Sequence, residues 1–145
     1  MKKINKLIVL LFIIVNFTNY SLAESNFFEE AKIKYDEKKY EESKFLFQRS
    51  IVFNPKDENS YLYLAKIYNF EENKKEEQKN IDTVLLLDPK NEEANYILME
   101  IELKRTNYSK VRELAENFSK ICNKLCGKED FILESLKNLE PKNES

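Results

Sequence analysis

The two cysteines are the residues whose type and spacing first suggest a chemistry. Cys122 and Cys126 are the only thiols among 145 residues, and they lie four positions apart. On a helix, that spacing places the two Cα atoms roughly 6 Å apart, a separation that a disulfide bond accommodates. In an exported chain, a single cysteine pair favours a disulfide over free thiols. We therefore expect a structural disulfide, with unpaired buried thiols and a redox or metal role as alternatives.

Other composition counts argue against enzymatic and metal chemistry. The spacing of the cysteines is not the two-residue spacing of thioredoxin-like motifs, and two thiols alone make a poor zinc site. The chain has no histidine, which excludes histidine general bases, histidine metal ligands and Ser-His-Asp triads. Its one glycine, Gly127, excludes the glycine-rich loops that bind phosphates.

Adjacent carboxylates remain as candidates for acid-base catalysis. Glu29 precedes Glu30, and Glu76 precedes Glu77. Neighbouring positions on a helix do not face each other, and nothing in the pattern indicates the burial that would raise a carboxyl pKa. We expect no catalytic residues, no cofactor and no bound metal.

The elements that carry these side chains are expected to be helices. Gly and Pro are rare, whereas Lys, Glu, Leu and Ile, which lose little rotamer freedom in a helix, are abundant. The 42% of apolar residues suffices for a core, and the 34% of charged residues indicates solvated helix faces. The length predicts one small all-α domain.

An internal repeat sets the arrangement of these helices. The stretch from Phe53 to Asp57 recurs 34 residues later as Leu87 to Asn91, with Pro55 and Pro89 in register. Each proline separates one helical pair from the next, because it disfavours helix in the residue before it. The same offset pairs Phe27 with Tyr61, Ala31 with Ala65 and Phe47 with Ile81, and a fainter third copy includes Leu98, Ile101, Ala115 and Phe118.

These residues resemble the tetratricopeptide repeat family, whose unit is a 34-residue pair of antiparallel helices. The most specific stretch runs from Lys39 to Ser43 and continues through Phe47, Ser50, Ile51 and Pro55. The chain departs from the family where Lys38, Glu72 and Thr106 hold turn positions that are commonly glycine. The resemblance implies an all-α solenoid of helical hairpins, with about three repeats and a C-terminal capping helix.

The expected boundaries follow from this period. The repeat domain covers residues 24–140, after a signal peptide over residues 1–23, and a frayed tail covers 141–145. Gly127 is expected to stop the last repeat helix, and an apolar stripe that includes Ile132 and Leu136 marks the capping helix. The repeats are expected at about 24–57, 58–91 and 92–125, and the capping helix at about 128–140.

The resemblance also implies a concave groove, lined by the first helix of each repeat, that holds a peptide or a partner helix. One subtype of the family clamps a C-terminal carboxylate with basic and asparagine side chains, but Phe28, Tyr63 and Ile97 replace three of these. The alternative for each aromatic residue is that it packs between helices. The implied groove residues are Phe28, Lys32, Tyr35, Leu62, Tyr63, Lys66, Asn69, Phe70, Tyr96, Ile97 and Glu100.

The N-terminal residues predict export. Three lysines precede an unbroken apolar run from Leu7 to Val15, and Ser21-Leu22-Ala23 supplies the small residues of a cleavage site after Ala23. Nine apolar residues are too few for the roughly 20 that cross a bilayer, so an uncleaved anchor is the minor alternative. We expect a periplasmic or secreted protein without a stable membrane span after cleavage.

Removal of residues 1–23 changes the charge balance. It deletes three lysines and no acids, so that 21 of the 24 basic residues remain beside 26 acidic ones, a formal charge of −5. Acids and bases are interleaved rather than gathered into a basic face, which argues against a nucleic-acid partner.

Together these features predict a non-enzymatic protein-protein interaction module in the cell envelope, which binds another protein, an envelope component, in its groove. The alternatives are a thiol-redox protein that uses Cys122 and Cys126, and a structural protein that self-associates as a homo-oligomer.

Overall fold

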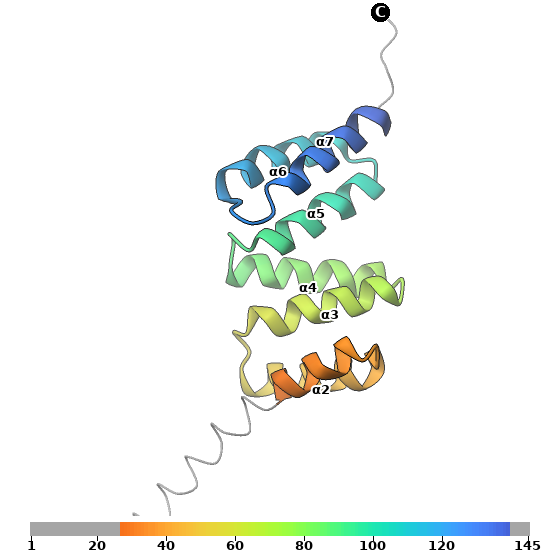
Figure 1. The fold of residues 1–145 in the computed structure, drawn as a ribbon, viewed down its shortest axis with the longest axis vertical. Coiled ribbons are helices and arrows are strands. Elements are labelled where there is room, and N and C mark those ends of the chain that lie inside the picture. Colours follow the sequence, from red (N-terminus) through yellow and green to blue (C-terminus); the bar gives the residue numbers. More distant parts are fainter. Residues whose placement is uncertain (1–26, 140–145) are drawn as a thin grey trace, which may run out of the picture. The chain divides into compact units, whose positions relative to one another are not determined.

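A computed structural model describes residues 27–139 of the chain (Figure 1). The predicted signal peptide and tail therefore lie outside the described residues. The chain divides after Ser60 into two compact units, which we describe separately. The helices are one over residues 27–36, then α2 (Tyr40–Phe53), α3 (Glu58–Phe70), α4 (Lys74–Leu87), α5 (Glu92–Lys104), α6 (Tyr108–Ile121) and α7 (Gly127–Leu139).

The predicted all-α class, with helical hairpins in about three repeats and a final capping helix, is confirmed. No strand occurs within residues 27–139. The first helices of the second and third hairpins start at Glu58 and, 34 positions later, at Glu92.

The turn inside each hairpin has the same backbone conformation. Lys38, Glu72 and Thr106 have positive φ angles of 60°, 57° and 59°. In the second hairpin the Glu72 N–H donates to the Asn69 carbonyl at 3.0 Å and the Asn73 N–H donates to the Tyr68 carbonyl at 2.8 Å. This pair of hydrogen bonds is typical of a helix C-terminus that ends with one residue in the left-handed conformation. Glycine adopts that conformation at the lowest energetic cost. All three residues here carry side chains, so each turn stores strain.

Helix starts and ends follow from asparagine caps and prolines. The side chains of Asn73 and Asn91 accept hydrogen bonds from the N–H groups of Glu76 at 3.3 Å and Ala94 at 3.0 Å. Each cap satisfies a donor that the first turn leaves unpaired. At the other end, α4 stops at Leu87, because Pro89 disfavours helix in the residue before it.

In the N-terminal unit, α2 packs against the helix over residues 27–36. Ala31, Ser43 and Phe47 are fully buried. The Ser43 hydroxyl donates to the Ala31 carbonyl at 2.8 Å, so the small side chain at position 43 is both buried and hydrogen-bonded.

In the C-terminal unit, two clusters of buried side chains form the core. One lies between α3, α4 and α5, and the other lies between α5, α6 and α7, with α5 contributing to both. The first consists of Leu62, Ala65, Ile81, Val84, Ala94 and Ile101, and the second consists of Met99, Val111, Leu114, Ala115, Phe118, Ile132 and Leu136.

The end of α6 differs from the sequence prediction. The helix stops at Ile121, so Cys122 and Cys126 lie in the following loop rather than on one helix, and Gly127 begins α7 instead of ending α6. Cys122 leaves the helix in an extended conformation, with φ −64° and ψ 145°. The Glu92 carboxylate then accepts the N–H groups of Lys124 and Leu125 at 2.9 and 2.8 Å. The loop is therefore stabilised by a distant side chain that the local sequence does not reveal.

Candidate functional site

The N-terminal unit contains three of the predicted groove residues. Phe28 is half-buried, with its ring centroid 5.6 Å from that of Phe47. Tyr35 is also half-buried and lies edge-on to Tyr40, with centroids 5.5 Å apart. Lys32 is exposed. The two aromatic residues thus pack within their own unit and offer only part of each ring to a ligand.

In the C-terminal unit, Lys66 of α3 forms an ion pair with a residue of α5. Its ammonium lies 2.7 Å from a carboxylate oxygen of Glu93 and 4.7 Å from the ring centroid of Tyr63. Tyr63 and Lys66 are both half-buried. The ion pair and the cation–π contact hold the tyrosine ring beside α5 with part of its surface accessible.

On α5, Tyr96 is held in a similar way. Its hydroxyl donates to Glu100 at 2.8 Å, and the ammonium of Lys128 lies 5.3 Å from its ring centroid. Burial, together with the hydrogen bond to the Glu100 carboxylate, raises the pKa of Tyr96 to about 12. The phenol therefore stays protonated near neutral pH. We call Tyr63, Lys66, Glu93, Tyr96 and Glu100 the α3–α5 face.

The other predicted groove residues of this unit fall into two groups. Leu62 is 5% exposed and belongs to the core, and Ile97 packs against the same cluster, so neither offers much surface to a ligand. Asn69 and Phe70 are exposed at the C-terminal end of α3.

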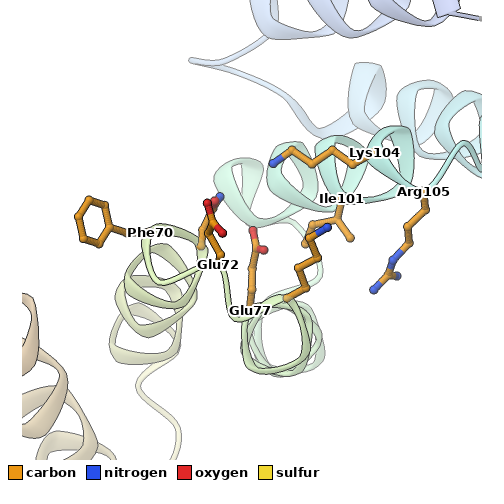
Figure 2. Close-up of a pocket in the computed structure, with 8 residues that line it drawn as sticks. Phe70, Glu72, Glu77, Ile101, Lys104 and Arg105 are labelled. Atoms are coloured by element: carbon orange, nitrogen blue, oxygen red, sulfur yellow. The ribbon is translucent and has the colours of Figure 1, made fainter.

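A pocket of about 480 Å³ adjoins that end of α3. It lies where the end of α3 and its turn, the start of α4 and the end of α5 come together (Figure 2). Its lining is strongly charged and consists of Asn69, Phe70, Glu72, Lys74, Glu77, Ile101, Lys104 and Arg105.

Glu77 is the residue of this pocket that the sequence interpretation missed. Its side chain rises from α4 toward α5 (Figure 2), it is 6% exposed, and its Oε1 atom has no hydrogen-bond partner among the described residues. Burial raises the pKa of the Glu77 carboxyl, and the nearby charge of Lys104 partly opposes this. The expectation that neither carboxylate of the Glu76–Glu77 pair is buried was therefore wrong for Glu77.

The repeat contained a signal for this burial. Positions 43 and 111 lie 34 residues before and after Glu77, and they hold a serine and a valine, residues that fit a helix core. Comparison of equivalent positions in the three repeats therefore predicts that the Glu77 side chain is buried.

The two cysteines lie close together in the loop between α6 and α7. Their Cα atoms are 5.2 Å apart and their Sγ atoms lie within disulfide-bonding distance. Cys122 is half-buried and Cys126 is exposed. Between residues 27 and 139, no three Cys, Asp or Glu side chains gather into a metal-binding group. Over the same residues, no helix has the length and apolar character needed to span a membrane.

Comparisons with known proteins identify the fold. No protein-family model and no curated protein matches the sequence. Among solved structures, the chain is similar to the TPR2B domain of yeast Sti1 in a complex with pHsp70, with a TM-score of 0.72, 12% identity, and coverage of 82% of this chain and 99% of that one.

Two further structures extend this finding. The TPR domain of Arabidopsis OM64 matches with a TM-score of 0.70 and 14% identity, covering 82% of this chain and 98% of that one. The Yersinia enterocolitica type III secretion chaperone SycD, in complex with a peptide of the translocator YopD, matches with a TM-score of 0.70 and 18% identity, covering 79% and 92%. The predicted tetratricopeptide-type fold is confirmed.

Proposed function

We propose that this protein is a non-enzymatic interaction module of the cell envelope, which binds a peptide or helix of another protein through the α3–α5 face. The observation that carries the proposal is the pair of half-exposed tyrosines, Tyr63 and Tyr96, each held by charged neighbours. Rigid aromatic side chains contribute large contact areas at a low cost in conformational entropy. A surface of this kind suits a peptide with alternating apolar and polar groups.

Similar structures support a peptide ligand without identifying it. The Sti1 and SycD structures are complexes with pHsp70 and with a YopD peptide. In this chain, Phe28, Tyr63 and Ile97 stand where the carboxylate-clamping subtype has basic and asparagine side chains. The proposed ligand is therefore an internal segment of a partner rather than a C-terminal carboxylate.

Export and the disulfide belong to the same proposal. The N-terminal sequence supports cleavage after Ala23 and a periplasmic or secreted location. An oxidising compartment favours a bond between Cys122 and Cys126, whose Cα separation fits one. The intact mass of the exported protein tests both points. The mass should correspond to a chain that starts at Glu24 and lacks two hydrogens, and a mass that retains residues 1–23 contradicts cleavage.

The binding face is tested by capture of partners from the envelope fraction with a Tyr63→Ala/Tyr96→Ala variant. We expect the captured partners to be lost, because both aromatic contacts are removed. A Phe131→Ala variant is the matched control, since Phe131 is an exposed aromatic residue of α7 outside the face. Circular dichroism checks that all variants stay helical. An unchanged set of partners in the double variant contradicts the proposed face.

A thiol-redox function is the second candidate, because Cys126 is exposed and its sulfur lies beside that of Cys122. An accessible bond of this kind can exchange with external thiols. Thiol trapping under graded reductant separates the two functions. A pair that stays oxidised across physiological potentials supports a structural bond, whereas a pair that titrates within that range supports redox exchange.

A further inference from the structure

The packing of the repeat does not require a carboxylate at position 77. The equivalent positions of the neighbouring repeats, Ser43 and Val111, are both fully buried. Ser43 is satisfied by its bond to the Ala31 carbonyl, and Val111 needs no polar partner. A small or apolar side chain therefore suffices for the fold at this position. Glu77 instead places an unpartnered oxygen in the interior, which costs free energy unless something outside the fold pairs with it.

The pocket that Glu77 lines carries charges of both signs, several of which are not joined in ion pairs. Glu72 is a second carboxylate on its lining, and Lys74 and Lys104 contribute ammonium groups. Within the described part of the chain, these three side chains make no ion pair. Arg105 differs, because its guanidinium is bound to Glu102 at 2.8 Å. Figure 2 shows the Lys104 side chain running along α5 toward the same opening as the carboxyl group of Glu77.

We infer that this pocket binds a mixed-charge segment of the partner, with a basic side chain on Glu77 and Glu72 and an adjacent acidic side chain on Lys74 and Lys104. The inference deepens the proposed function and rests on it, since the segment belongs to the partner protein. A volume of about 480 Å³ has room for two such side chains.

The buried position of Glu77 explains why the basic group is the main determinant. Lys74 and Lys104 are exposed, so water screens their repulsion of an incoming cation. The Glu77 carboxylate is 6% exposed, where a charge-assisted hydrogen bond is stronger. A guanidinium or ammonium group provides the missing donor to Oε1. The carboxylate of the ligand then neutralises the lysines, so that only a ligand with both charges matches the whole lining.

The test uses a short probe, acetyl-Arg-Glu-amide, added to the full mature protein while amide resonances are followed by NMR. We expect concentration-dependent shifts of the amides of Phe70, Glu77 and Lys104, and about tenfold weaker binding when glutamine replaces either residue of the probe. Glu77→Gln should weaken binding of the intact probe about tenfold. Glu76→Gln is the matched control, because Glu76 lies on the same helix but pairs with Lys79 outside the pocket.

Each outcome decides the inference. If Glu77→Gln alters the amide spectrum throughout, Glu72→Gln replaces it as the test variant, because Glu72 is exposed on the turn. Three results would overturn the pocket assignment. They are equal binding of the probe with glutamine in place of arginine, unchanged probe binding in both protein variants, and no shift of any amide resonance. The partner-capture experiment stays independent. If Tyr63→Ala/Tyr96→Ala abolishes capture but the probe does not bind, the proposed function stands and the pocket inference fails.

Discussion

At the scale of single residues, Glu77 is a place where this protein departs from a sequence optimised for stability. We predict that Glu77→Val raises the free energy of unfolding by about 1–2 kcal/mol at neutral pH, because it removes a buried oxygen without a partner. Val111 shows that valine fits the equivalent position of the next repeat. Urea unfolding measures the change. A loss of stability would mean that the carboxylate has a partner in the native state.

The stability gained by Glu77→Val should depend on pH. Burial raises the folded pKa of Glu77 above its value of 4.5 in the unfolded chain. The carboxylate therefore destabilises the fold increasingly as the pH rises through that range, and the cost is complete above the folded pKa. The advantage of Glu77→Val should be largest near pH 7 and should shrink toward pH 4. Glu76→Val, at a more exposed position on the same helix, should show no such trend.

The left-handed turns give a second prediction for single residues. Thr106→Gly should stabilise the protein by about 1 kcal/mol, because a β-branched residue at φ 59° is strained and glycine is not. The greater freedom of glycine in the unfolded chain offsets part of the gain. Thr83→Gly in the interior of α4 is the matched control and should destabilise. A lower melting temperature for Thr106→Gly would contradict strain at this turn.

The residues of the candidate site were predictable to different degrees. The period of 34 places Tyr63, Lys66 and Tyr96 on the first helices of their repeats, whereas their assignment to a groove was implied by the family resemblance. The pairing of Lys66 with Glu93 was not predictable, because it depends on the distance between two helices. The burial of Glu77 was missed because charged residues are almost never buried alone, and only comparison with positions 43 and 111 indicates it.

At the scale of secondary-structure elements, the loop between α6 and α7 depends on Glu92. The backbone N–H groups of Asn123, Leu125 and Lys124 lower the pKa of the Glu92 carboxyl. The stabilisation is therefore present above the unfolded pKa near 4.5 and is lost as the pH falls through the folded pKa. We predict that Glu92→Gln lowers stability at pH 7 and that its difference from the wild type disappears in acid. Glu116→Gln, an exposed carboxylate of α6, should have no effect at either pH.

The capping helix gives the second prediction at this scale. Ile132 is fully buried in the cluster between α5, α6 and α7, so Ile132→Ala should cost about 2–4 kcal/mol. The loss should appear first as faster hydrogen exchange in α7. Leu133→Ala is the control, because Leu133 is 40% exposed one position along the same helix. Equal effects of the two substitutions would mean that α7 does not pack through Ile132.

The capping helix also marks the limit of prediction from sequence for the elements. The period of 34 and the prolines were enough to predict the hairpins as far as α5, because each helix before α6 ends near a proline or at a turn inside its own repeat. Gly127 was misinterpreted because a lone glycine after a helix resembles a C-cap. The helix ends instead at Ile121, and the loop after it is held by the carboxylate of Glu92, which is 32 residues away from Lys124 in the sequence.

At the scale of the whole molecule, the apolar and charged residues have separate roles. If residues 1–23 are removed as predicted, the formal charge is −5, and acids and bases are interleaved along the remaining sequence. We expect such interleaved charges to stay hydrated, without the basic patch that binds nucleic acid. In the proposed function, recognition depends on the half-buried aromatic and charged side chains of the α3–α5 face and on the pocket that Glu77 lines.

The predicted signal peptide leads to a prediction for the whole molecule, namely that the chain folds without residues 1–23. A protein that starts at Glu24 should have the helical circular dichroism and the melting temperature of the full chain, because the predicted signal peptide is not part of the repeat domain. A chain that starts at Lys39 is the contrasting variant. It lacks Ala31, the acceptor for the buried Ser43 hydroxyl, and Phe28, the ring beside Phe47. That chain should lose hydrogen-exchange protection in α2. If the chain from Glu24 melts several degrees below the full chain, residues 1–23 belong to the fold and cleavage after Ala23 is wrong.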